Sequence, residues 1–268
     1  MISLKRNSRG ELIPATGKRS TASSSYNPNQ KNDFKISRSK FSDFLTCPRC
    51  FYMDRVLGLA EPGTPGWALN SATDELLKRE FDKCREEQTP HRLFEKYNLN
   101  HLVPFKHEEI DTWRDALRGG IIQRFEDTNI ILTGGVDDIW LDTKTKELIV
   151  VDYKSQASLN EVEPITYLNN VYHEGYKIQM DFYNYLLTCK GFKTSSISYF
   201  LVVNADRTAE GFNEQMKFSE TLIPYKNDYS WIPDKVREMI VTMNSKDIPE
   251  SHISCENCAY ARERSALE

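Results

Sequence analysis

Two short runs rich in β-branched and apolar residues, joined by a polar turn, constrain the fold of this chain more than any other feature. The first run, NIILTGGVDDIWLD, covers residues 129–142, and the second, ELIVVDYKS, covers residues 147–155. The stretch DTKTKE between them has the composition of a turn, so the sequence predicts a β-hairpin. The second run is almost wholly apolar up to Asp152, which is typical of a central, buried strand.

The charged residues at the end of this hairpin can meet on one side of a sheet. Asp152 and Lys154 project to the same face because side chains alternate along a strand, and Tyr153 projects to the opposite face. Pairing across the turn can place Asp137 beside them. Two carboxylates and the Tyr153 carbonyl are the oxygen ligands that Mg²⁺ prefers. The ammonium of Lys154 can orient an attacking water or offset charge on a scissile phosphate.

The same pattern also occurs on solvated strand edges, where alternating Asp and Lys residues need no function. The apolar run before Asp152 argues against that alternative, because an unpartnered carboxylate at the end of a buried strand is costly. A bound metal ion would remove this cost.

Other periodic segments surround the hairpin in the sequence. Ser39 is a suitable N-cap for a short helix, and Pro48 begins a second helix that stops at Gly58. The spacing of apolar residues predicts three longer helices and one more buried strand, over residues 69–81, 173–188, 231–242 and 196–205 respectively. This mixture predicts a single α/β domain.

Length and composition exclude a membrane protein and make a disulfide scaffold unnecessary. A chain of 268 residues can bury a core without disulfides. Hydrophobic residues make up 39% and charged residues 28%, and no apolar stretch approaches the roughly 18 residues of a membrane span. The N-terminal residues lack the apolar segment of a secretory signal. We therefore expect a cytoplasmic protein whose six cysteines are thiols or metal ligands.

The charge of the chain is unevenly distributed. The formal net charge is −4, yet residues 1–40 carry nine Lys and Arg residues against two acidic ones. Residues 1–33 are also rich in Ser and Asn, so we expect a flexible basic tail there and one folded domain over residues 34–268. The rest of the chain, after residue 40, is therefore acidic. Its contacts with nucleic acid must come from local basic patches.

The motifs in and after the hairpin resemble those of the PD-(D/E)XK nuclease superfamily. The resemblance is to its RecB-like branch, which includes the CRISPR-adaptation nucleases and helicase-associated nuclease domains. The segment FLTCPRCFYMDRVLGL also resembles the start of these domains, and the similarity runs from Phe34 to Tyr260. Three short motifs match in the family's order: G-x-x-D at Gly134 and Asp137, D-x-K at Asp152 and Lys154, and Q-x-x-x-Y at Gln179 and Tyr183.

The resemblance implies a fold and an activity. The fold is α/β, with a restriction-endonuclease-like core in which helices flank a central mixed β-sheet. The activity is hydrolysis of DNA phosphodiester bonds with Mg²⁺ or Mn²⁺, with exonuclease action in repair, recombination or defence among the roles. Asp137 and Asp152 would hold the metal, while Gln179 and Tyr183 would position the site or the DNA backbone. No helicase motif is present, so a helicase partner would be a separate chain.

One position departs from the family pattern. Many members of this branch carry a metal-binding His four residues after a Gly in the helix before the hairpin, and Asn70 stands there in GWALN. An Asn offers a carbonyl oxygen but no nitrogen ligand, so the site should be harder and less inclined toward Mn²⁺. This departure leaves a second hypothesis open: a non-catalytic nucleic-acid-binding or scaffold protein with a degenerate nuclease site.

Two C-x-x-C pairs lie at opposite ends of the expected domain, Cys47 with Cys50 and Cys255 with Cys258. Two such pairs predict one four-thiolate metal site that joins the N- and C-terminal segments. Related cluster-bearing nucleases use one early cysteine and three late ones, so Cys50 would replace the third late one. Either Zn²⁺ or a [4Fe–4S] cluster fits this spacing. A thiol oxidoreductase is disfavoured because neither pair follows a strand that opens a βαβ unit.

Overall fold

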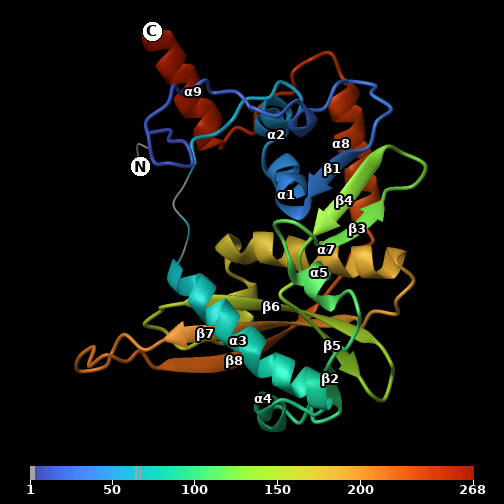
Figure 1. Cartoon of the computed structure of the whole chain (residues 1–268), viewed down its shortest axis with the longest axis vertical. Helices are drawn as coiled ribbons and strands as arrows, with labels where there is room; N and C mark the ends of the chain where they lie inside the picture. Colours follow the sequence, from blue (N-terminus) through green and yellow to red (C-terminus); the bar gives the residue numbers. More distant parts are fainter. Residues whose placement is uncertain (1–3, 64–65, 67) are drawn as a thin grey trace. The chain divides into compact units, whose positions relative to one another are not determined.

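The computed structural model describes residues 4–63, 66 and 68–268, so the first three residues of the expected tail lie outside the described part. The chain forms two compact units (Figure 1). Unit 1 comprises Met1–Gly66, Arg124–Ile131 and Pro233–Glu268, and unit 2 comprises Trp67–Gln123 and Leu132–Ile232. The sequence predicted one domain after residue 33, although the Pro- and Gly-rich stretch EPGTPG at residues 61–66 lies at one of the points of division.

Unit 2 is built on a five-stranded mixed sheet with the strand order β2-β5-β6-β7-β8. Strands β6 and β7 pair in parallel, and the other neighbours are antiparallel. The strands are β2 (Leu102–Pro104), β5 (Asp138–Asp142), β6 (Leu148–Gln156), β7 (Ile197–Ala205) and β8 (Phe218–Lys226). The helices of this unit are α3 (Ala68–Glu87), α4 (Arg92–Lys96), α5 (Ile110–Arg114), α6 (Pro164–Leu168), η2 (Val171–His173) and α7 (Glu174–Cys189).

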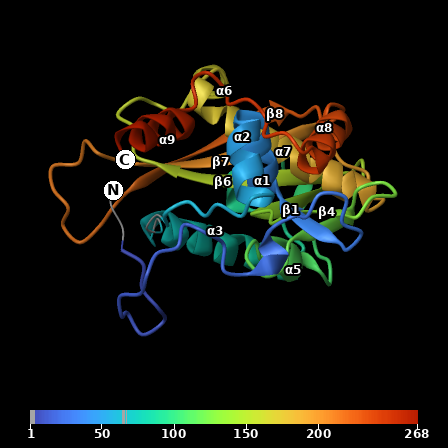
Figure 2. The ribbon, with the colours of Figure 1, turned by 90° about the horizontal axis from the view of Figure 1, so that it is seen from above.

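Helices flank the sheet, as expected for this α/β fold. Apolar residues of α3, among them Leu77 and Phe81, pack with Trp140 of β5 and Tyr153 of β6 in one buried cluster. Both views of the ribbon place α3 along the sheet (Figures 1 and 2). Because side chains alternate along β6, Asp152 faces away from that cluster, toward α7.

A smaller sheet has the strand order β1-β4-β3, with β1 (Phe34–Ser37), β4 (Ile130–Gly134) and β3 (Ile121–Arg124). We expected residues 129–142 to form one strand. The structure divides them into β4 and β5, which belong to different sheets, because the chain turns after Gly134. The hairpin is therefore β5–β6, and Asp137 lies in the connection before it.

The described residues of unit 1 form the 3-10 turn η1 (Ala22–Ser24) and the helices α1 (Arg38–Thr46), α2 (Pro48–Arg55), α9 (Glu256–Leu267) and α8 (Ile232–Asn244), whose first residue belongs to unit 2. The prediction of Ser39 as an N-cap was wrong, because Ser37 Oγ accepts the bond from the Lys40 amide. Pro48 begins α2 as predicted. Within the described residues no helix has both the length and the apolar character needed to cross a membrane.

The N-terminal segment makes specific contacts within unit 1, where a flexible tail was expected. Tyr26 is 2% exposed, and its hydroxyl donates to Asn244 Oδ1 over 3.0 Å. Arg19 forms an ion pair with Asp54 of α2. The composition of residues 4–33 is that of a loop, and these contacts link the loop to α2 and to Asn244, the last residue of α8.

Candidate nuclease site and cysteine centre

The β5–β6 ladder ends where the candidate site begins. Its last pair is Asp138 with Val151, and beyond it the Tyr153 amide donates to Asp137 Oδ2 over 2.7 Å. The N–H and C=O groups of one strand residue point to the same side. The Tyr153 carbonyl is therefore directed toward the edge where Asp137 lies.

Asp152 is fully buried, and its two oxygens have different partners. Gln179 Nε2 of α7 donates to Oδ1 over 2.5 Å. Oδ2 forms an ion pair with Lys154 Nζ but accepts no hydrogen bond of suitable geometry from the described residues. A buried carboxylate oxygen with this free capacity, beside a second carboxylate and a backbone carbonyl, fits a hard divalent cation.

Burial and mutual repulsion alter the titration of these groups. Burial, and after it the nearby Asp152 carboxylate, together raise the pKa of Asp137 to about 7, against the opposing effects of Lys154 and Lys78. Burial disfavours the charged form of Lys154, yet Asp152 and Asp137 outweigh it and hold the pKa of this ammonium above its usual value. Lys154 therefore carries a positive charge at neutral pH.

The ammonium of Lys154 also has an aromatic neighbour. Its Nζ lies 4.6 Å from the ring centre of Tyr176, near the start of α7, which is within cation–π range. Another neighbour of this ring is His173, stacked at a centroid distance of 5.0 Å. Nothing in the sequence marked Tyr176, because it was one of several aromatic residues on a predicted core helix.

The two residues of the Q-x-x-x-Y motif lie one turn apart on α7, and both are buried. Gln179 contacts Asp152 directly. Tyr183 packs on the chain at Gly134, where an added Cβ would lie only 2.6 Å from Tyr183 Cε1. The structure thus brings the three motifs of this site together.

Helix α3 adds two charged residues near the site, one helical turn apart. Asp74 and Lys78 form an i,i+4 ion pair at 2.9 Å and are only partly exposed. Burial raises the pKa of Asp74, and Lys78 opposes this while the Asp137 carboxylate adds to it. Asn70 lies one turn before Asp74 and is exposed. The i,i+4 spacing of Asp74 and Lys78 can be read from the sequence, but their nearness to Asp137 cannot.

A second charged group lies on the other face of β5 and β6. Asp138 is fully buried and accepts hydrogen bonds from Arg85 Nη2 (2.5 Å), the Tyr153 hydroxyl (2.9 Å) and Trp140 Nε1 (3.3 Å). Arg85 in turn donates to the Phe105 carbonyl over 2.7 Å. These bonds compensate the buried charges and anchor the side chain of Tyr153, whose backbone holds Asp137.

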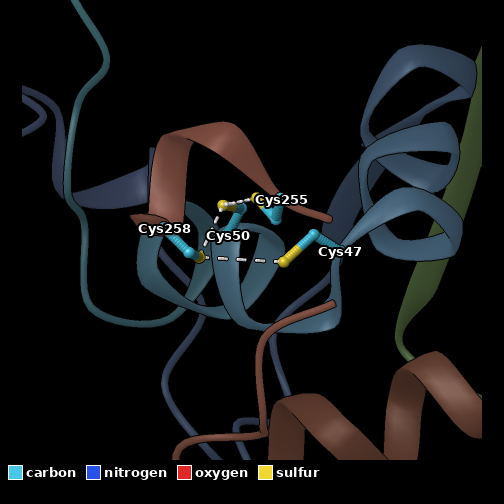
Figure 3. Close-up of side chains that lie close together, drawn as sticks. All are labelled: Cys47, Cys50, Cys255 and Cys258. Atoms are coloured by element: carbon cyan, nitrogen blue, oxygen red, sulfur yellow. Dashed lines mark hydrogen bonds between the residues drawn. The ribbon is translucent and has the colours of Figure 1, made fainter. Parts of the chain in front are cut away.

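The four cysteines Cys47, Cys50, Cys255 and Cys258 converge within unit 1 (Figure 3). Their sulfur atoms all lie within 4.8 Å of one another. Neighbouring Sγ atoms are 3.3 Å apart between Cys50 and Cys258, 3.5 Å between Cys50 and Cys255, and 3.9 Å between Cys47 and Cys258. Cys84 and Cys189 are not in this group. The centre joins segments from the two ends of the chain, as predicted.

Each C-x-x-C pair occupies the same place on its helix. Cys47 is the N-cap of α2 and Cys255 is the N-cap of α9, so the remaining two cysteines lie in the first turns. Helix N-termini favour negative charge. Burial opposes ionisation of Cys47, but backbone hydrogen bonds at Cys50 and His252 lower the pKa of its thiol to about 7. Burial raises the pKa of the Cys50 and Cys258 thiols, so this lowered value does not extend to them. Four neighbouring thiols nevertheless suit a soft or borderline metal ion, which binds them as thiolates.

Comparison with known proteins identifies the family. The family model of the PD-(D/E)XK nuclease superfamily matches residues 35–262. The chain belongs to this superfamily. Among solved structures, a protein from Eubacterium rectale named "Putative exonuclease" aligns at 14% identity and a TM-score of 0.42, covering 84% of this chain and 87% of that chain. The curated protein sequences contain no match. Membership of a nuclease superfamily implies a nucleic-acid substrate.

Proposed function

We propose that the protein is a metal-dependent deoxyribonuclease whose active site lies at the end of the β5–β6 ladder. The observation that carries this proposal is the fully buried Asp152 carboxylate, which has Lys154 on one oxygen and Gln179 on the other, with Asp137 nearby. If Asp152 and Lys154 formed only a structural ion pair, the second carboxylate, Asp137, would not be needed. It would be unfavourable, because two negative charges at one edge raise the cost of burial.

The residues divide the work by their chemistry. Asp137, Asp152 and the Tyr153 carbonyl would hold Mg²⁺ or Mn²⁺, which when bound polarises phosphate oxygens and acidifies water. Lys154, positively charged at neutral pH, would orient the attacking water or stabilise charge on the phosphate. Gln179 fixes the Asp152 carboxylate through its hydrogen bond. Tyr183 would maintain this geometry from the same helix, or contact the DNA backbone.

The biological setting is part of the same proposal. We infer a role of the RecB-like kind, with DNA ends as substrate, in repair, recombination or defence, and with a separate helicase or another nucleic-acid-processing protein as partner. A cytoplasmic location accords with this role. The four cysteines would hold Zn²⁺ or a [4Fe–4S] cluster that supports the fold of unit 1.

The alternative is a nucleic-acid-binding or scaffold protein of the same fold that no longer cleaves. The observation in its favour is Asn70, in place of a His that many relatives use as a metal ligand. Against it stands Asp74, one turn further along α3, which is close enough to Asp137 for that carboxylate to affect its titration. A carboxylate there can supply the hard oxygen ligand that Asn70 supplies less strongly.

The deciding experiment incubates the purified chain with end-labelled single- and double-stranded DNA, with and without Mg²⁺ or Mn²⁺. We expect metal-dependent cleavage. The variants Asp152→Asn and Lys154→Ala should each lose it by on the order of 100-fold or more. The matched control is Asp206→Asn, an exposed carboxylate in the β7–β8 loop, which should retain full activity. Binding of DNA without cleavage by the wild type under every condition would favour the non-catalytic alternative.

A further inference from the structure

The spacing of the four sulfur atoms distinguishes the two kinds of metal centre that the C-x-x-C pattern allows. In a tetrahedral site with metal–sulfur bonds of about 2.3 Å, neighbouring sulfurs are about 3.8 Å apart. The three distances of 3.3, 3.5 and 3.9 Å, and the limit of 4.8 Å for all pairs, agree with this geometry. The four side chains bring their sulfur atoms into one group (Figure 3).

A [4Fe–4S] cluster needs a wider opening. Each thiolate would then bind a different iron, and the four irons with their bridging sulfides would lie between the cysteines. Four sulfur atoms that all lie within 4.8 Å of one another leave room for one ion only. The division of the ligands into two C-x-x-C pairs is also a spacing found in closed Cys₄ zinc sites.

Helix α9 depends on this centre more than on any apolar contact. Cys258 is its one buried residue, while Tyr260 is 67% exposed and Leu267 is 89% exposed. Its other described contacts are polar and at the surface, such as Asn257 to Glu61 at 3.2 Å and Arg262 to Ser251 at 3.3 Å. An isolated helix of this length is marginal in water. The helix therefore lacks the buried surface that would hold it on unit 1.

We propose that Cys47, Cys50, Cys255 and Cys258 bind a single four-coordinate Zn²⁺ ion, and that this ion holds helix α9 on unit 1. The ion joins residues that are 205 positions apart, Cys50 and Cys255. Contacts such as Tyr52 to Ser245 and Arg49 to Pro249 already hold the chain on unit 1 as far as residue 249. The free energy of zinc binding is therefore needed to order the segment that follows, which includes α9. This role is independent of the nuclease proposal.

A shallow cavity of about 820 Å³ depends on the same ion. The cavity is lined by residues of α2, of the loop at Leu59 and of α9, among them Arg49, Met53, Tyr260 and Arg262. Cys50 and Cys258 also form part of its wall. Since one wall is α9, the cavity exists only while the ion holds that helix in place.

The first test counts metal in the purified full-length chain. We expect one zinc per chain by elemental analysis, no iron, no acid-labile sulfide and a colourless protein, also after anaerobic purification. Each of the four Cys→Ser variants should lose the zinc, whereas Cys84→Ser and Cys189→Ser should keep it. A brown protein with about four irons and four sulfides per chain would overturn the proposal, as would one iron without zinc.

The second test uses the wild-type chain, so that it does not depend on the folding of a variant. Hydrogen exchange is followed by mass spectrometry before and after removal of zinc by a strong chelator. We expect peptides of α9 to lose their protection while peptides of β6 and β7 keep theirs, and added Zn²⁺ to restore the original pattern. Unchanged protection of α9 in the zinc-free chain would show that other contacts hold the helix.

Discussion

Gly134 lies so close to the ring of Tyr183 that a methyl group at position 134 would come within 2.6 Å of Tyr183 Cε1. Gly134 begins the motif that contains Asp137, and Tyr183 ends the motif that begins at Gln179. The φ of Gly134 is not in the left-handed region, so the backbone conformation does not require a glycine there. What requires the glycine is the close approach of the Tyr183 ring. The position of α7 over the site thus depends on the absence of a side chain at 134.

Gly134→Ala is expected to weaken both the fold and the site. The ring of Tyr183 is buried and must move, and overpacking of this kind costs roughly 1–3 kcal/mol. Because Gln179 is one turn away on the same helix, the Gln179–Asp152 hydrogen bond should lengthen and cleavage should fall. Urea denaturation and DNA cleavage measure the two effects.

The control is Gly175→Ala, near the start of α7, the helix that carries Tyr183. An added Cβ there meets nothing within 4 Å, so the change should leave stability unchanged or raise it by about 0.5–1 kcal/mol. Equal stabilities of the two variants would contradict the packing argument.

Tyr176 is expected to position Lys154 for its role in the site. Tyr176→Leu removes the ring that lies 4.6 Å from the ammonium, an interaction worth about 0.5–2 kcal/mol when partly desolvated. We expect this variant to cleave DNA several-fold more slowly, with little change in the affinity for Mg²⁺. Tyr176→Phe keeps the ring and should retain most of the activity. Similar rates for the Leu and Phe variants would show that the ring does not act on Lys154.

The parts of the site that could be predicted from the sequence are those governed by local geometry. Alternation along β6 places Asp152 and Lys154 on one face with Tyr153 opposite, and the helical repeat places Gln179 and Tyr183 one turn apart. The two C-x-x-C pairs were also informative, because four thiols in a chain with few others have a limited set of uses. These inferences needed no knowledge of how distant segments meet.

The parts that were missed depend on contacts between distant segments. The bond between Arg85 and Asp138 joins residues 53 positions apart, and nothing near either residue indicates the pairing. Strand β8 escaped prediction because it has no regular alternation of buried and exposed residues and carries Pro224. The break between β4 and β5 was hidden by a continuous β-rich composition, although the Gly134–Gly135 pair was a local signal for it.

The N-terminal segment is expected to contribute to the stability of unit 1. Tyr26 packs edge-to-face with Phe34 at a centroid distance of 5.3 Å, and its amide and hydroxyl both form hydrogen bonds. Tyr26→Ala should therefore cost about 3–5 kcal/mol, as for other large buried aromatic residues. Tyr26→Phe removes only the bond to Asn244 and should cost about 0.5–1.5 kcal/mol.

Thermal and urea denaturation measure these differences, and Arg9→Ala, at an exposed position, is the control. If Tyr26→Ala unfolds at the same denaturant concentration as the control, the segment is a flexible tail, as its composition suggested.

Asp181 of α7 is expected to make the stability of unit 2 depend on pH. Burial raises the pKa of its carboxyl to about 6, although donors from Trp231, the Asp228 amide and Tyr225 favour the ionised form. In the unfolded chain its pKa is about 3.9. Between these values the folded state binds more protons than the unfolded state, so this residue's contribution to stability is largest below pH 4 and declines as the pH rises to 6.

Asp181→Asn removes this titration and leaves the other carboxylates in place. The free energy of unfolding of the wild type, minus that of the variant, should therefore decrease by about 1–2 kcal/mol between pH 4 and pH 6, and then stay constant up to pH 8. Urea denaturation at closely spaced pH values measures the difference. Because an Asn side chain has one acceptor oxygen where the carboxylate has two, the variant is expected to be less stable at every pH. A difference that stays constant from pH 4 to pH 6 would show that the Asp181 carboxyl ionises as readily in the folded protein as in the unfolded chain.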